Sequence, residues 1–250
     1  MTRTVQPEHP GGPPPSLPKG RRVYAIGDVH GRLDLLDRLI GMIRSDDARR
    51  RHAETEVILL GDLIDRGPDS AGVLARAMTG SVGFAPLHTL MGNHEEQMID
   101  CVLGDGQMLD AWLFYGGRET LRSFGVPEWV INSDDPAMVI RGAATAIPRD
   151  LVNWVRALPV SRRIGDYLFV HAGVRPGVPL DKQDPLDLRW IRREFLESTA
   201  DHGAVVVHGH SIRPEVQLHP NRIGIDTGAY ASGRLTALGL EGGDHWILHT

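Results

Sequence analysis

Five short apolar runs in this chain each end on residues of a type that binds metal ions. Each run is short and rich in branched aliphatic side chains, which is typical of a buried strand. If the strands lie side by side, the residues that follow them should meet at one edge of the sheet, where open α/β sheets carry their sites. These residues are Asp28 and His30, Asp62, Asn93 and His94, His171, and His208 with His210.

The composition is that of an ordinary folded protein. Of the 250 residues, 41% are hydrophobic and 24% are charged, so a sizeable core can form. The formal net charge of -5 gives no general attraction to nucleic acid or membrane, and no apolar stretch is long enough for a membrane span. We therefore expect no stable nucleic-acid complex and no membrane association. The lone Cys101 excludes an internal disulfide and suits a reducing compartment, so we expect a cytoplasmic protein.

The pattern along the chain predicts one α/β domain over residues 21–250, preceded by a disordered tail over residues 1–20 that is rich in Pro and Gly. Strand and helix signals alternate after residue 23, which is typical of βαβ units with parallel strands. The middle, residues 109–158, reads as helices. Strand signals return from residue 160 and are interrupted by one helix near residues 188–198. Two mixed β-sheets packed together and flanked by helices would fit this order.

The ligand types indicate which metals would bind. Carboxylates with imidazoles suit Mn²⁺, with Fe²⁺ or Zn²⁺ as alternatives, better than Ca²⁺. There are more ligands than one ion needs, so we expect two divalent ions that share a carboxylate. After Asp28, Asp62 and a bridging hydroxide are counted, the site keeps a positive charge, and Arg66 lies nearby in the sequence. Such a site favours a phosphate group, and the hydroxide could attack its phosphorus.

The segments around these residues resemble the signature blocks of the phosphoprotein phosphatase family of metallophosphoesterases. As a set the blocks are specific, whereas Asp-x-His alone is a weak signal, and the third block is most similar to small bacterial and phage serine/threonine phosphatases. The resemblance implies a calcineurin-like sandwich. The blocks are Gly27-Asp28-Val29-His30-Gly31, Gly61-Asp62-Leu63-Ile64-Asp65-Arg66-Gly67, Gly92-Asn93-His94-Glu95, His171-Ala172-Gly173-Val174 and Gly209-His210.

The same resemblance implies the metal ligands. Each ion would have its own ligands, and the carboxylate of Asp62 would bridge the two ions. The first ion would be held by Asp28, His30 and Asp62, and the second by Asp62, Asn93, His171 and His210.

It also implies the catalytic residues. His94 would be the general acid that protonates the leaving oxygen, and Asp65 would orient it. Arg66 would donate two hydrogen bonds to the phosphate. A second phosphate-binding arginine is expected later in the chain, and we assign Arg192. Two nearby arginines remain alternatives for that role, Arg189 and Arg193.

Other notable residues have ordinary structural interpretations. His208 precedes the last block, and we expect it to support a ligand or end a strand rather than bind metal. Cys101 should be buried and inert. Trp112, Phe114 and Tyr115 occur at helical spacing and are expected to belong to the core.

The expected activity is hydrolysis of phosphomonoesters, with phosphoserine or phosphothreonine in proteins as the preferred substrate. The alternative is symmetrical bis(5'-nucleosyl)-tetraphosphate hydrolysis, with the related removal of RNA caps, so a phosphorylated protein or a nucleotide is the expected partner. Asp65 and Glu95 favour the first reading, because the resemblance assigns both to the protein-phosphatase pattern. A catalytically inactive scaffold is disfavoured, because no ligand is missing.

Overall fold

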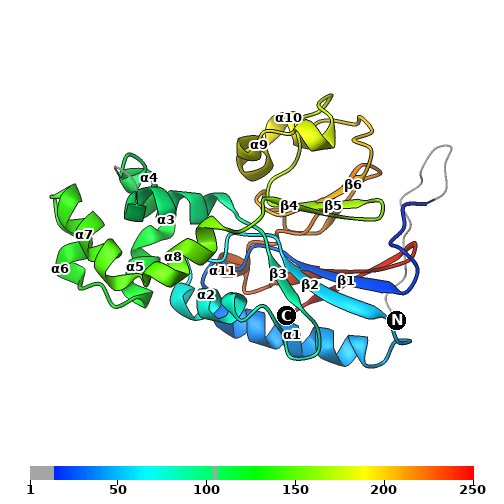
Figure 1. Cartoon of the computed structure of the whole chain (residues 1–250), viewed down its shortest axis with the longest axis horizontal. Helices are drawn as coiled ribbons and strands as arrows, with labels where there is room; N and C mark the ends of the chain where they lie inside the picture. The colour runs from blue at the N-terminus through cyan, green and yellow to red at the C-terminus, as the bar shows by residue number, and fades with distance from the viewer. Residues whose placement is uncertain (1–13, 104–105) are drawn as a thin grey trace.

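Two five-stranded β-sheets lie face to face, with helices against their outer faces (Figure 1). The structure is a computed structural model that describes residues 14–103 and 106–250. In the first sheet β1, β2 and β3 are parallel, and β9 and β10 are antiparallel additions beside β1. The strand order is β10-β9-β1-β2-β3. The strands are β1 (Arg21–Ile26), β2 (Glu54–Leu59), β3 (Leu87–Thr89), β9 (Thr236–Glu241) and β10 (Asp244–His249).

The second sheet has the order β4-β5-β6-β8-β7. Its central strands β5, β6 and β8 are parallel, and the edge strands β4 and β7 are antiparallel to their neighbours. The predicted arrangement of two mixed sheets flanked by helices is therefore confirmed. The strands are β4 (Ser161–Ile164), β5 (Tyr167–Val170), β6 (Val205–His208), β7 (Gln217–Leu218) and β8 (Arg222–Gly224).

Alternating side chains of β1 build a core on each side of the first sheet. Val23 and Ala25 pack between the two sheets, in a cluster that includes Phe169 of β5. Tyr24 and Ile26 point to the opposite face and pack in the cluster that contains the apolar side of α1. All four β1 side chains are fully buried. A large apolar side chain contributes about 1.5–3 kcal/mol when it is fully buried, so this strand anchors both layers.

The helices divide into layers and a lobe. The first sheet is covered by α1 (Leu33–Asp47) and α2 (Ser70–Met78), and the second by α9 (Pro185–Trp190) and α10 (Arg193–Leu196) (Figure 1). Helices from the middle of the chain gather at one end of both sheets, at the left of Figure 1, and form what we call the helical lobe. The lobe contains α3 (Asn93–Leu103), α4 (Leu109–Trp112), the π-helix η1 (Leu113–Gly117), α5 (Arg118–Ser123), α6 (Glu128–Ile131), α7 (Pro136–Ala146) and α8 (Arg149–Arg156).

The single helix predicted near residues 188–198 is wrong, because the chain breaks it into α9 and α10. Ile191 is extended at φ -59° and ψ 141°, and Arg192 follows at φ -130° and ψ -91°. The break lets Ile191 bury its side chain in the apolar cluster that includes Leu188 and Phe195. Two further short helices are η2 (Leu180–Lys182) and α11 (Ala229–Ser232).

The chain before β1 is ordered from the first described residue onward. Leu17 is buried against the core between the sheets, and its backbone N–H donates to the carbonyl of Gly242. The backbone N–H of Ser16 donates to the carboxylate of Asp166. Residues 14–20 therefore differ from the disordered tail that we predicted, because Leu17 supplies an apolar anchor. The rest of that predicted tail, residues 1–13, lies outside the described residues.

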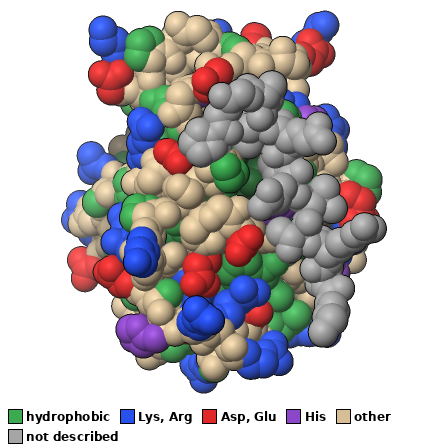
Figure 2. All heavy atoms as spheres, turned by 90° about the vertical axis from the view of Figure 1, so that its right-hand side faces the viewer, with side chains coloured by type: hydrophobic (Ala, Val, Ile, Leu, Met, Phe, Trp, Pro, Cys, Tyr) green, Lys and Arg blue, Asp and Glu red, His purple; other side chains and the backbone are tan. Residues whose placement is uncertain are grey.

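The described surface carries charges of both signs. In Figure 2, Lys and Arg side chains lie among Asp and Glu side chains over the face that is coloured. Among the described residues, none of the helices combines the length and the apolar character that crossing a membrane requires.

Asp46 near the end of α1 ties that helix to the first sheet. Its carboxylate accepts hydrogen bonds from the hydroxyl of Tyr24 at 2.6 Å, from the indole N–H of Trp246 at 2.9 Å and from Nε of Arg50 at 2.8 Å. Burial alone would raise the pKa of Asp46, but these hydrogen bonds outweigh it and the pKa is lowered. The ionised carboxylate thus fastens β1, β10 and α1 together.

We expect Asp46→Ala to lower the free energy of unfolding by about 3 kcal/mol, because it leaves the buried Tyr24 hydroxyl without its partner. Urea denaturation at pH 7 measures the change. Since the folded-state pKa of Asp46 is lowered, its contribution is present above the unfolded pKa and is lost as the pH falls. The difference between the two proteins should therefore shrink below about pH 4. The control Asp37→Ala removes an exposed carboxylate from the same helix and should change stability by less than about 0.5 kcal/mol.

Candidate functional site

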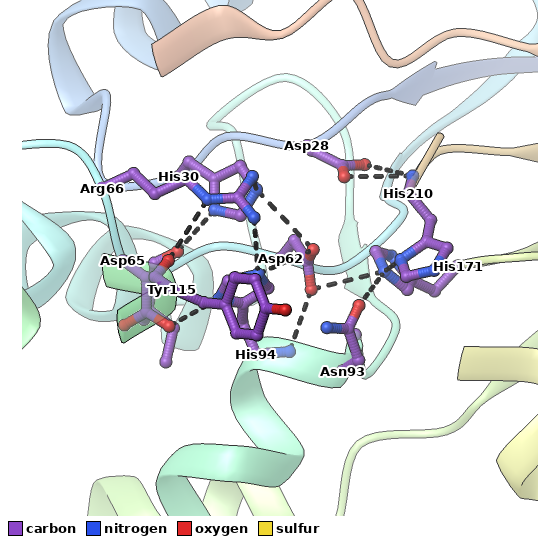
Figure 3. Close-up of polar contacts among 12 residues, drawn as sticks. Asp28, His30, Asp62, Asp65, Arg66, Asn93, His94, Tyr115, His171 and His210 are labelled. Carbon is purple, nitrogen blue, oxygen red and sulfur yellow. Dashed lines mark hydrogen bonds and ion pairs between the residues drawn. The ribbon is translucent and has the colours of Figure 1, made fainter. Parts of the chain in front are cut away.

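The residues predicted to be metal ligands meet where the two sheets reach the helical lobe (Figure 3). Loops after β1 and β2 carry Asp28, His30 and Asp62, α3 begins at Asn93, and His171 and His210 follow β5 and β6. None of these six side chains is more than 5% exposed. The structure thus brings together all six residues that were predicted from the strand ends.

The backbone around these residues is strained. In the described part of the chain, the non-glycine residues with positive φ all lie in this site, and a conformation of this kind costs about 1–3 kcal/mol per residue. Such strain persists only where the surrounding structure enforces it, and it concentrates at functional sites. The residues are His30 (45°), Asp62 (49°), Asp65 (74°), Arg66 (67°) and His210 (61°).

Asp62 is shared by two groups of side chains that could each hold a metal ion. In one group its Oδ2 lies 3.6 Å from Nε2 of His30 and 3.8 Å from Nε2 of His94. In the other group its Oδ1 lies 3.3 Å from Nε2 of His171, and His210 completes the set. A single carboxylate therefore faces both positions, as a bridging ligand would.

The hydrogen bonds of the group around His171 leave several lone pairs pointing at one region, which suits a cation. Nδ1 of His171 lies 3.0 Å from the carbonyl of Leu60, which can only accept, so the neutral ring carries its proton there and a lone pair on Nε2. That Nε2 faces Oδ1 of Asn93 at 2.9 Å and Nδ1 of His210 at 3.1 Å. These acceptors, together with Asp62, converge on one region, and a bound cation would satisfy their lone pairs together.

Asp28 has a different position from the other predicted ligands. Both of its oxygens accept the backbone N–H of His210, at 3.1 and 3.0 Å, and it belongs to neither of the two groups. Burial and the nearby charges of Asp226 and Asp62 raise the pKa of Asp28 well above its usual range. The predicted first-ion set therefore has His30 and Asp62 in place, with His94 rather than Asp28 as the third nearby group.

Asp226 is a site residue that our prediction did not include. It is buried beside Asp28, and one of its carboxylate oxygens, Oδ2, has no hydrogen-bond partner among the described residues. The signal was present, because Asp226 directly follows the apolar run Ile223–Ile225, as the other ligand-type residues follow theirs. Its strand, β8, spans only Arg222–Gly224, so the strand signal in the sequence is weak.

His94 and Asp65 form a buried pair. Nδ1 of His94 lies 2.6 Å from Oδ2 of Asp65, whose carboxylate also accepts from Nε1 of Trp112 at 3.1 Å and from the hydroxyl of Thr120 at 2.5 Å. Burial lowers the pKa of His94, but the charge of Asp62 and the hydrogen bond with Asp65 outweigh it, and the pKa is raised. A protonated imidazole is thereby favoured, which is what a general acid requires.

Arg66 lies across the two imidazoles of the first group. Its guanidinium donates to Nε2 of His30 at 2.9 Å, and another of its nitrogens lies 3.1 Å from Nε2 of His94. The guanidinium carbon also lies 4.7 Å from the ring centre of Tyr230, a cation–π contact. A fixed guanidinium beside the candidate metal positions is suited to bidentate binding of a phosphate.

The three candidate arginines after residue 188 differ in their partners. Arg189 donates to the carboxylate of Glu96 at 3.0 and 2.6 Å, and Arg193 pairs with Glu197 on the surface. Arg192 instead donates to the carbonyl oxygen of His210 at 3.2 Å. Of the three, Arg192 is the one that contacts a residue of the site and is not paired with a carboxylate.

The aromatic residues of the lobe correct part of our prediction. Trp112 is fully buried and supports Asp65, as a core residue should, but Phe114 is 82% exposed and Tyr115 is 50% exposed. The helix is interrupted beside them, because Gly116 has a non-helical φ of 115° and kinks the chain. Cys101 is buried as predicted, and burial raises the pKa of its thiol to about 12.

Glu95 has a structural role in the site. It is fully buried, and its carboxylate accepts the backbone N–H groups of Asp62 at 3.0 Å, Leu63 at 2.8 Å and Gly92 at 2.9 Å. It therefore holds the loop that carries Asp62 against the start of α3. Gly92 must be a glycine there, because a Cβ would lie 2.3 Å from Oδ1 of Asp62.

Comparison with known proteins gives a consistent family. The model of the calcineurin-like phosphoesterase family matches residues 21–235. The symmetrical bis(5'-nucleosyl)-tetraphosphatase of Acidovorax sp. (strain JS42) is 31% identical over 62% of this chain and 44% of that protein. Serine/threonine-protein phosphatase 1 of Salmonella typhimurium is 29% identical over 88% of this chain and 93% of that protein. The chain spans less than half the length of the tetraphosphatase relatives that it matches.

The fold is also found among solved structures. One structure, provisionally assigned as a diadenosine tetraphosphatase, superimposes with a TM-score of 0.63 at 22% identity. The match covers 92% of this chain and 94% of that chain, so the likeness in fold extends over most of both chains.

We expect Asp62→Asn to empty the metal centre, because it removes the one carboxylate that faces both groups. Metal analysis after dialysis against Mn²⁺ should show fewer than two ions per chain. The matched control Asp150→Asn changes an exposed carboxylate on α8, and it should bind as many metal ions per chain as the unaltered protein. Two ions retained by Asp62→Asn would contradict the assignment of a shared ligand.

We expect His94→Asn to lower kcat on alkyl phosphates by about 10²–10⁴-fold, because an alkoxide must be protonated as it leaves. The loss should be smaller on p-nitrophenyl phosphate, whose leaving group is much less basic. Asp65→Asn should show the same pattern in milder form. Equal losses on the two substrates would argue against the acid role.

Proposed function

Because the chain belongs to the calcineurin-like phosphoesterase family, we propose that it hydrolyses a dinucleoside polyphosphate, of which diadenosine tetraphosphate is the leading substrate. This is the alternative activity that the sequence suggested, and it now replaces phosphoprotein hydrolysis as the preferred reading. It is supported by the names of the tetraphosphatase relatives and by an aromatic surface beside the site.

The observation that carries the proposal is the exposed aromatic pair Phe114 and Tyr115. Their rings meet edge to face at 5.2 Å, and the backbone of this turn is bonded to Arg66. The carbonyl of Tyr115 accepts from Nε of Arg66 at 3.3 Å, and the carbonyl of Gly116 accepts from its backbone N–H at 3.2 Å. Figure 3 shows Tyr115 among the labelled residues of the site. Large exposed rings beside a phosphate-binding arginine suit a nucleobase.

The residues of the site can divide the reaction among them. Divalent ions, for which we favour Mn²⁺, would act as Lewis acids on the phosphate and acidify the attacking water. Arg66 would bind a phosphate through its guanidinium, and Arg192, which donates to the carbonyl of His210, is the candidate for a second contact. His94 would deliver the proton held at Nε2 to the departing oxygen, and Asp65 would keep Nδ1 oriented.

The position of Glu95 weakens the argument that favoured phosphoproteins. The sequence suggested that Glu95 marks a protein phosphatase, but its carboxylate binds three backbone N–H groups and is fully buried. A buried residue that only binds the backbone of a loop does not contact the substrate, so it does not select between substrates. The substrate is better inferred from side chains at the mouth of the site.

Phosphoserine or phosphothreonine in proteins remains the second candidate. Asp65 favours it, because a fully supported acid at His94 is needed most when the leaving group is an alkoxide. The Salmonella relative named as a serine/threonine-protein phosphatase also matches over nearly its whole length.

We expect kcat/KM to be higher for diadenosine tetraphosphate than for phosphoserine or phosphothreonine peptides and capped RNA, assayed side by side with Mn²⁺. Tyr115→Ala should raise KM for diadenosine tetraphosphate about tenfold, since stacking of one base is worth about 1–3 kcal/mol. It should leave KM for p-nitrophenyl phosphate unchanged. The control Trp129→Ala removes another exposed ring of the lobe and should leave KM for both substrates unchanged. A tenfold preference for any phosphopeptide would establish the second candidate instead.

A further inference from the structure

A cavity outside the metal-ligand cluster lies beside the loop that carries His210. Its volume is about 200 Å³, and we call it the Arg213 pocket. It is enclosed by the end of α10, the end of β6, the loop after His210, and strands β7 and β8. The residues that line it are Leu196, His208, Ser211, Arg213, Gln217, His219, Arg222 and Gly224.

The lining carries positive charge with no acid to offset it. Arg222 is only 8% exposed, and its guanidinium donates to the carbonyls of Leu196 and Ser198 and to the amide oxygen of Asn221. Burial lowers its pKa, and no carboxylate counteracts this. Arg213 has no hydrogen bond or ion pair from its guanidinium within the described ranges, and no Asp or Glu lines the pocket there. Arg213 is exposed, whereas Arg222 is a buried cation without a counter-ion. Such a cation is costly, and an anion would relieve that cost.

Two buried polar groups of the lining also have no partner. They are Oγ of Ser211, a residue that is 8% exposed, and Nε2 of His208, a residue that is 2% exposed. Nδ1 of His208 lies 3.0 Å from the carbonyl of Gly209, so the neutral ring carries its proton on Nδ1 and its Nε2 accepts. The pocket thus offers several donors, and Nε2 of His208 is a buried acceptor among them.

We propose that the Arg213 pocket binds a phosphate group that retains a P–OH, as inorganic phosphate or as the terminal phosphate of a nucleotide. The ionised oxygens would accept from Ser211, Arg213 and Arg222. The hydroxyl would donate to Nε2 of His208. Sulfate has the same shape but carries no proton at neutral pH, so the unpaired acceptor Nε2 of His208 discriminates against it.

The pocket is coupled to the metal centre by the chain itself. Ser211 follows His210, and His208 precedes it by two residues. The turn between them is tight, because the N–H of Ser211 donates to the carbonyl of Gly209 at 2.6 Å. A phosphate held here would lie on the far side of the loop that positions His210, where a product of phosphate-ester or anhydride hydrolysis could be retained.

Calorimetric titration of the full chain with inorganic phosphate tests the proposal, first with Mn²⁺ and then after chelation. The pocket uses no metal, so binding should persist after chelation and should exceed the binding of sulfate at least severalfold. Arg213→Gln should weaken it about tenfold, because it removes a charge-assisted hydrogen bond. The control Arg193→Gln removes an exposed arginine of α10 and should bind as the unaltered chain does.

A third titration, with ADP, identifies the source of the phosphate group. If the terminal phosphate of a nucleotide is the occupant, ADP should bind the chelated chain more tightly than inorganic phosphate does, and Arg213→Gln should abolish that advantage. Equal affinities would assign the pocket to free phosphate. The choice of ADP rests on the proposed function, but the binding itself does not, so the pocket can be confirmed even if the enzyme prefers phosphoproteins. Loss of all binding on chelation, or equal affinities for phosphate and sulfate, would overturn the proposal.

Discussion

The convergence of lone pairs on Asp62 is the constraint on which the rest of the structure depends. A carboxylate, an amide oxygen and three imidazole nitrogens lie within a few ångströms of one another in a buried space. Groups of this kind repel one another unless a cation lies between them, so the fold must hold them in place by other means. It does so with strained backbone at Asp62 and His210 and with the backbone hydrogen bonds that Glu95 accepts. The local instability is balanced by the two apolar layers on either side of β1.

That balance explains why the site lies where it does. The cores above and below the first sheet are built from alternating side chains of the same strands, so the packing of both cores fixes where those strands end. Ligands attached there need few further contacts to hold them in place, and those contacts are individual hydrogen bonds. Trp112 and Thr120 of the helical lobe fix Asp65, which in turn fixes His94. The lobe thus orients His94, the proposed proton donor, while the sheets position the groups that could hold metal.

The sequence predicted the architecture and the residues at the strand ends well, because both follow from local rules. A short apolar run followed by Asp or His indicates a strand and its carboxyl end without knowledge of the partners. The sequence could not reveal that Ile191 leaves the helix to bury its side chain, or that the chain kinks at Gly116 and leaves Phe114 and Tyr115 exposed. Those outcomes depend on contacts distant in sequence. Asp28 illustrates the same limit, since its hydrogen bonds to His210 join positions 182 residues apart.

Specificity is therefore expected to depend on the parts that local patterns describe least. The groups that we propose to contact phosphorus oxygens lie at strand ends, and the relatives that this chain matches carry names of different activities. The side chains that would contact the rest of a substrate come from η1, from the loop after α9 and from α11, where Tyr230 packs against His30 and Arg66. These three segments approach the same centre from different layers of the fold. A change in any one of them could alter the substrate while leaving the ligand cluster intact, so likeness in the signature blocks alone indicates the chemistry more securely than the substrate.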